Sequence, residues 1–189
     1  MQAPEAYGPR FAPLLTPNLP ALGPESADET VRPKLATITV EDAFEGHRVV
    51  DQSAAACCIS ALWLWHDFLD ESHRISQDID TIEGSYWHAI MHRREPDYGN
   101  ARYWFRRVPK HPIFAPLAAS ARELADAQPL DPPAQFLARQ DSWDAFRFVD
   151  LCEAIALGQS KCEDLARRIA AVEWQLLFDY CYRQAIGTC

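Results

Sequence analysis

Residues 83–112 read EGSYWHAIMHRREPDYGNARYWFRRVPKHP. Thr81 is a favourable N-cap with Glu83 in the first turn, which predicts a helix from about Thr81 to Glu95. The sequence Pro96-Asp97-Tyr98-Gly99 is typical of a turn, and a second helix is predicted from about Asn100 to Val108, before Pro109. This hairpin holds three of the six histidines, two of the six tryptophans and six of the eighteen basic residues of the chain.

Further helices are predicted on both sides of the hairpin. Residues 51–79 carry apolar residues at helical spacing with no Gly or Pro, which indicates one central buried helix or a pair joined near Asp67. Thr39 caps a short helix, and Ser160 is a candidate N-cap for the last one. Helices are also expected at about residues 115–127, 143–157 and 162–186. Since alternation is confined to residues 35–40, we predict an all-α fold, an irregular bundle of about six to seven helices.

The first 33 residues have a different composition. They carry seven of the fourteen prolines, whose fixed φ and missing N–H exclude regular structure. The segment 1–33 is therefore expected to be an extended arm. Its scattered apolar residues, such as Tyr7, Phe11 and Leu14, indicate that it lies on a single helical domain formed by residues 34–189.

Composition limits the classes of function. A net charge of −9 argues against nucleic acid as a partner, because phosphate binding needs a basic surface. No apolar run approaches the roughly 18 residues of a membrane span, and the N-terminus lacks the pattern of a signal peptide. We therefore expect a cytoplasmic protein whose six cysteines are free thiols. Signatures of serine hydrolases, P-loop proteins and dinucleotide-binding proteins are missing from the sequence.

The segment 84–112 resembles one tetratricopeptide repeat, whose pattern is W-x2-L-G-x2-Y, then A-x3-F, then P. The matching small and aromatic positions are Ala89, Ala101 and Phe105. Departures from the pattern occur at Ser85, His88 and His92, which replace the Trp, Leu and Tyr, and at Pro112, which comes one residue early. The match spans about 29 residues, and no second copy is found. The resemblance implies a helical hairpin and allows a peptide as the ligand.

A longer string, YWHAIMHRREPDYGNARYWFRRV at residues 86–108, looks like segments of an uncharacterised bacterial all-helical family. No activity is attached to that family. The resemblance therefore implies a helical fold and adds no mechanism.

Histidines and carboxylates at helical spacing form a candidate metal site. His88 and His92 are four residues apart, so both point from one helix face, and Glu95 continues that face. The preceding predicted helix repeats the pattern with His66, Asp70 and His73. If the two helices pack antiparallel, the six residues would converge on a divalent metal such as zinc or iron. The alternative is that these histidines are hydrogen-bonded core residues.

Basic residues in the hairpin form a second candidate site. Six of them lie between Arg93 and Lys110, against only two acidic residues. The expected ligand-binding residues are Arg93, Arg102, Arg106, Trp87 and Trp104. Guanidinium groups bind carboxylate or phosphate in bidentate fashion, so a small anion beside the aromatic rings is one interpretation. Internal pairing with acidic residues of the later helices, including Asp150, Glu153 and Glu173, is the other.

These patterns lead to two hypotheses about function. The first is a binding or scaffolding protein that recognises a protein partner, a peptide or a small anion at the hairpin. The second is a metal-dependent enzyme, with hydrolysis as the expected reaction, that uses the histidine and carboxylate cluster. The sequence identifies neither a substrate nor an oligomeric state.

Overall fold

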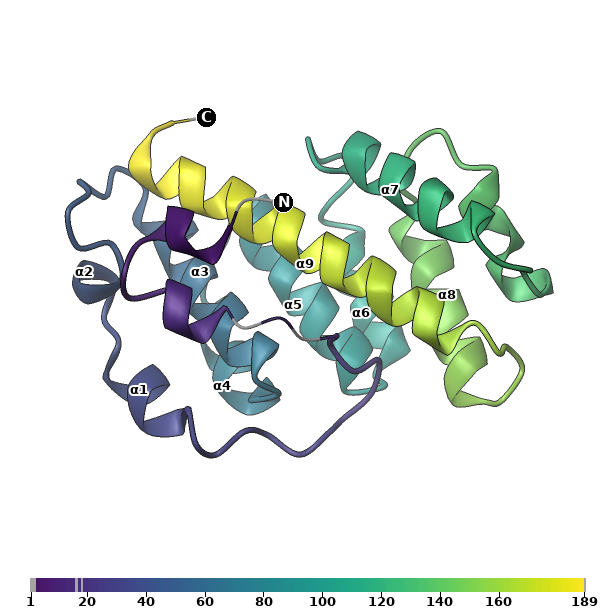
Figure 1. Ribbon diagram of the computed structural model, residues 1–189, viewed down its shortest axis with the longest axis horizontal. Coiled ribbons are helices and arrows are strands. Elements are labelled where there is room, and N and C mark those ends of the chain that lie inside the picture. Colours follow the sequence, from purple (N-terminus) through teal and green to yellow (C-terminus); the bar gives the residue numbers. More distant parts are fainter. Residues whose placement is uncertain (1–2, 16, 18, 189) are drawn as a thin grey trace.

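The computed structural model describes residues 3–15, 17 and 19–188, and within them the protein is all-α, as predicted. The helices form an irregular bundle that α9 crosses along its length (Figure 1). The 3₁₀ helices are η1 (Pro4–Tyr7), η2 (Ala12–Leu14) and η3 (Pro132–Ala138). The α-helices are α1 (Arg32–Thr37), α2 (Val40–Ala43), α3 (Gln52–Trp65), α4 (Leu69–Ser76), α5 (Ile82–Arg94), α6 (Tyr98–Phe105), α7 (Phe114–Asp126), α8 (Ala145–Ala156) and α9 (Glu163–Ile186). No helix of this part of the chain has the length and apolar character needed to cross a membrane.

The core is organised around α3, which packs against α4, α5 and α9. Nearly all of α3 is buried, because its apolar and small residues surround the helix axis. The Trp174 ring of α9 lies 4.5 Å from Trp65 and 5.8 Å from Trp87, centroid to centroid. Trp174 Nε1 donates to the carbonyl of Ala61 over 3.1 Å, so this polar group is satisfied inside the core.

The long apolar stretch 51–79 is divided into α3 and α4 at Asp67, whose φ of 67° is left-handed. Such a residue ends a helix, so the predicted pair joined near Asp67 is the correct alternative. Arg94 of α5 closes the break. Its guanidinium donates to the Asp67 carboxylate and, over 2.8 Å, to the Leu64 carbonyl.

The start of α5 follows the predicted cap. Thr81 Oγ1 accepts from the N–H of Gly84 over 3.0 Å. Gly84 also allows a close approach of the preceding loop, since a Cβ at this position would lie 2.2 Å from the Ile79 carbonyl oxygen. The hairpin of α5 and α6 then packs on α4 and α8.

The last helix begins within one residue of the predicted position, but the predicted N-cap, Ser160, was wrong. The N-cap of α9 is Cys162, without a side-chain capping bond. Ser160 Oγ instead donates to the Asp131 carboxylate over 2.9 Å, because the loop containing η3 brings that carboxylate close. In this loop, residues 132–138 begin with two prolines and form the 3₁₀ helix η3, which the sequence patterns did not indicate.

The proline-rich arm lies on the bundle, and it is more structured than expected. It contains η1 and η2, since a proline fits the first turn of a 3₁₀ helix where no N–H is needed. The predicted boundary at residue 33 falls inside α1. Tyr7 and Phe11 are buried with their rings 5.1 and 5.4 Å from Phe178 of α9.

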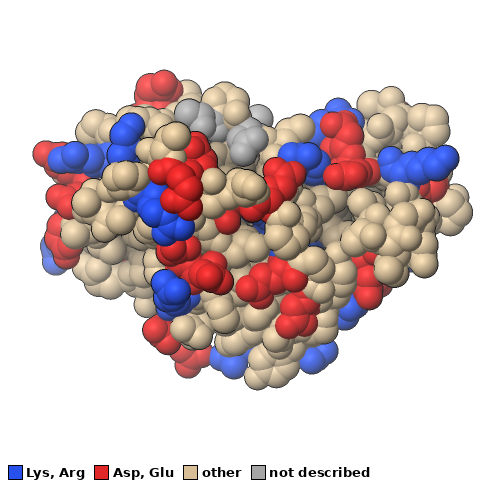
Figure 2. Space-filling model, turned by 90° about the horizontal axis from the view of Figure 1, so that it is seen from below, with Lys and Arg blue, Asp and Glu red and all other residues tan. Residues whose placement is uncertain are grey.

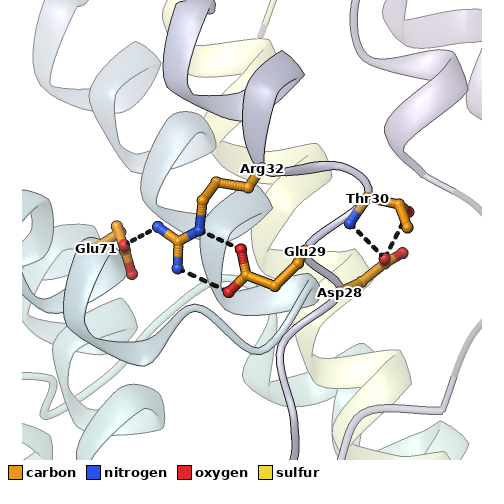
Figure 3. A network of polar contacts seen from close by, with 5 residues as sticks. All are labelled: Asp28, Glu29, Thr30, Arg32 and Glu71. Carbon is orange, nitrogen blue, oxygen red and sulfur yellow. Dashed lines mark hydrogen bonds and ion pairs between the residues drawn. The ribbon is translucent and has the colours of Figure 1, made fainter.

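Arg32, at the end of the arm, forms an ion pair with α4 (Figure 3). The Arg32 guanidinium donates to Glu29 over 2.6 Å and to Glu71 of α4 over 2.5 Å. It also lies 4.3 Å from the centroid of the Phe68 ring. Beside it, the Asp28 carboxylate accepts from the N–H and the hydroxyl of Thr30, which fixes the turn before α1.

Candidate metal centre

Three of the histidines singled out from the sequence lie together between α4 and α5. His88 and His92 are one helical turn apart on α5, and His73 comes from α4, which packs against it. One ring nitrogen from each residue lies within 4.8 Å of the other two. Imidazole nitrogens from two packed helices therefore lie close together, an arrangement from which helical bundles build metal sites.

Ring packing fixes the planes of these side chains. The His88 ring stacks on Trp104 of α6 at 4.0 Å and on His92 at 4.7 Å, with interplanar angles of 16° and 23°. His73 meets both histidines edge-on, at 4.8 Å from His88 and 5.2 Å from His92. His88 and His92 are buried, with 2% and 6% of their surface exposed, whereas His73 is half-buried. The cluster thus has a closed side at Trp104 and a more accessible side at His73.

Hydrogen bonds distinguish the two buried histidines. His92 Nδ1 lies 3.1 Å from Glu95 Oε2. A ring N–H at Nδ1 donates to this carboxylate, which leaves Nε2 as the basic nitrogen of a neutral imidazole. Neither ring nitrogen of His88 has a hydrogen-bond partner among the described residues. A buried unpaired imidazole is costly in a core, whereas a metal ligand needs such a free nitrogen.

The electrostatic environment favours the neutral form of His88 and of His92. Burial, followed by the nearby His92 and His73, lowers the pKa of His88 to about 3. Burial also lowers the pKa of His92, and the Glu95 carboxylate opposes that shift. Both residues therefore present unprotonated nitrogen at neutral pH, which is the form that binds metal.

The remaining predicted ligands do not join the three histidines. His66 is the C-cap of α3, before the break at Asp67, so it does not continue the helical face of Asp70 and His73. Its Nε2 pairs with the carbonyl of Leu14 in the arm over 2.8 Å. Asp70 is exposed on α4, outside the cluster. Of the predicted carboxylates, Glu95 alone contacts a histidine of the cluster, as the partner of His92.

The predicted anion-binding residues face different neighbours. Arg93 is 2% exposed, donates to Glu173 over 2.5 Å and lies over the Phe148 ring at 4.6 Å. Arg102 donates to Asp150 and Glu153 of α8, over 2.6 and 2.5 Å. These contacts agree with the internal pairing that the sequence allowed as the alternative. On the face shown in Figure 2, acidic and basic side chains are interspersed, without a continuous basic patch.

The other three predicted residues are also separated. Arg106 is exposed, with its guanidinium 5.6 Å from the Tyr103 ring. Trp87 is buried against Trp174, and Trp104 covers His88. The position of Trp104 was not predicted, although a signal existed. His88 and Trp104 are equally far in sequence from Pro96, so a hairpin that turns there places them opposite each other.

Comparisons with known proteins assign neither a family nor a function to this chain. The chain matches no model of a known protein family, no curated protein and no solved structure. The contacts of the histidine cluster are therefore the basis on which a function is argued.

Proposed function

We propose that this protein binds one divalent transition metal ion, zinc or ferrous iron, through His73, His88 and His92. The observation that carries the proposal is the convergence of three imidazoles within 4.8 Å. Nitrogen ligands at about 2.0–2.1 Å from a tetrahedral ion lie roughly 3.4 Å from one another. Small side-chain rotations would close the difference, and the half-buried His73 has the most room to make them.

The surroundings of the cluster support the same proposal. Glu95 holds His92 in one tautomer, as outer carboxylates do for histidine ligands in metal sites. Trp104 fixes the plane of His88 without occupying either nitrogen. A bound cation would also supply the polar partner that His88 lacks, so it would offset the free-energy penalty of burying an unpaired imidazole.

Recognition of a small anion or a peptide at the hairpin has less support. Arg93 and Arg102 already bind carboxylates of α8 and α9, which removes two of the expected donors. The tetratricopeptide resemblance suggests a peptide groove, yet α5 packs against α3 and α4, and α6 against α8. A peptide would have to bind elsewhere on the hairpin. A cytoplasmic location stays part of the proposal, and the free thiols at Cys57, Cys58, Cys152, Cys162 and Cys181 agree with it.

Metal titration of untagged protein tests the proposal. The chain is stripped with a chelator and titrated with Zn²⁺ by calorimetry, alongside His88→Gln, His92→Gln and the control His47→Gln. His47 is exposed and outside the cluster, so this control changes the histidine count and leaves the site intact. We expect one ion per chain for wild type and control. The two cluster variants should lose more than the 10- to 100-fold in affinity that loss of an outer partner causes.

Circular dichroism of each variant shows whether its helices remain folded. Equal stoichiometry and affinity in all four proteins would refute the proposal. A folded wild type that takes up no metal, by calorimetry or by elemental analysis, would refute it as well.

A further inference from the structure

We infer that a metal ion in the three-histidine cluster keeps one coordination position open, and that this position takes water or a small anion binding through one atom. The inference rests on the proposed function and adds the ligand class of the site. Closed metal sites in proteins use four protein ligands, whereas three protein ligands and a water are typical of catalytic zinc. The coordination of the ion therefore depends on whether the chain offers a fourth ligand.

Among the described residues, no further His, Cys, Asp or Glu lies with the three imidazoles. The group whose ligand atoms lie within 4.8 Å of one another consists of three imidazoles, without a thiol or a carboxylate from residues 3–15, 17 or 19–188. His66 is committed to the Leu14 carbonyl, and Asp70 is exposed outside the group. The metal would thus have three ligands from α4 and α5.

The two carboxylates that follow α5 have other partners. Glu95 Oε2 pairs with His92 Nδ1, on the far side of that ring from Nε2. Both oxygens of Asp97 accept from Asn100, one from its N–H over 3.1 Å and one from its side-chain amide over 2.9 Å. Glu95 therefore orients a ligand, and Asp97 caps α6.

Solvent reaches one side of the cluster. Trp104 covers His88, whereas His73 is half-buried and the Glu95 side chain is 31% exposed. A fourth ligand from solution would approach at this side, between α4 and the end of α5. Water fits such an opening, and so does a small anion.

The charge of the ion allows a small anion as well as water at the open position. Three neutral imidazoles leave the two positive charges of the ion uncompensated by its ligands, and the nearby carboxylates of Glu95 and Asp97 have other partners. Bound water at such a site loses a proton more readily than free water, because the metal stabilises hydroxide. The ligand class is therefore water or hydroxide, and monodentate anions such as azide or cyanate.

Cobalt substitution tests this inference apart from the proposed function. Metal-free protein is loaded with Co²⁺, whose visible absorption reports ligand number, and azide is then titrated. We expect cobalt bands that change saturably with one azide per ion, both in wild type and in His47→Gln. Glu95→Gln should also bind azide, with 10- to 100-fold weaker metal affinity, because Glu95 is an outer partner.

The possible outcomes separate the two proposals. Absence of cobalt bands and of bound cobalt would refute metal binding itself. Cobalt bands that azide leaves unchanged would show a closed site and overturn the open position. If azide alters the spectrum of Glu95→Gln but not of wild type, Glu95 is the fourth ligand and the inference is wrong. Bands that depend on protein concentration, with dimers in sedimentation, would assign the fourth ligand to a second copy and also overturn it.

Discussion

Replacing Glu173 by Gln should destabilise the fold strongly, because it leaves a buried cation without its counter-ion. Glu173 of α9 is fully buried, and it accepts from Arg93 over 2.5 Å and from Tyr86 over 3.0 Å. Glutamine keeps the size of the side chain and an acceptor for Tyr86. The main change is therefore the loss of one negative charge beside a guanidinium that is 2% exposed.

The expected magnitude follows from burial. Removing one partner of a buried ion pair costs about 3–5 kcal/mol of unfolding free energy, because the other charge stays desolvated. An exposed pair contributes only about 0–1 kcal/mol. Arg107 and Asp80 form such a pair, with side chains 45% and 90% exposed. Arg107→Gln is thus a matched control, because it removes one charge from an exposed pair with little expected effect.

Urea denaturation followed by circular dichroism measures both variants. The midpoint should fall markedly for Glu173→Gln at an unchanged slope, and shift little for Arg107→Gln. The double variant Arg93→Met, Glu173→Gln should regain much of the loss, because it removes the unpaired charge. If Glu173→Gln costs no more than the exposed control, the argument from burial is wrong.

Two further predictions concern the arm and the histidines. Phe11→Ala should cost about 3–5 kcal/mol of unfolding free energy and lower the melting temperature by at least about 6 °C, since Phe11 is fully buried beside Phe44 and Phe178. The control Leu19→Ala, at a 37% exposed position of the arm, should change the melting temperature little. Equal melting temperatures for Phe11→Ala and wild type would show that the arm contributes no stability. In the folded, metal-free protein, His88 stays neutral because its pKa is lowered to about 3. In the unfolded chain it gains a proton below about pH 6.5. Its contribution to the unfolding free energy therefore rises with pH, by about 1.4 kcal/mol per pH unit between pH 3 and 6.5. Denaturation at pH 5 and 6.5 should give a smaller difference for His88→Gln than for wild type, and equal differences would contradict the lowered pKa.

The sequence predicted most of the helices, because their signals are local. Thr81 caps α5 and Gly187 ends α9 in a left-handed conformation, as single residues can do. Ser160 was misassigned because its partner, Asp131, is 29 residues away. A side-chain bond of that range depends on how the loops pack, and helix spacing carries no information about it.

In the candidate site, too, the features set by local spacing were predicted, and those set by tertiary packing were not. The spacing of His88 and His92 indicated a shared face, and His73, also named from the sequence, lies beside them because α4 packs on α5. His66 was expected on the same helix face as Asp70 and His73, and the left-handed Asp67 separates it from them. The roles of Arg93 and Trp104 depended on which residues of α8, α9 and α5 lie opposite them, which requires the tertiary arrangement.

The contact of the arm with α9 has a consequence for folding kinetics. Tyr7 donates to Asp179 over 3.2 Å, a contact that spans 172 positions of the sequence. During synthesis, the arm leaves the ribosome long before α9 is made, so its apolar side chains stay unburied until α9 has formed. Closing so long a loop is slow compared with forming the α5 and α6 hairpin from neighbouring residues. Docking of the arm is thus expected as a late step of folding, after the histidine-bearing helices have formed.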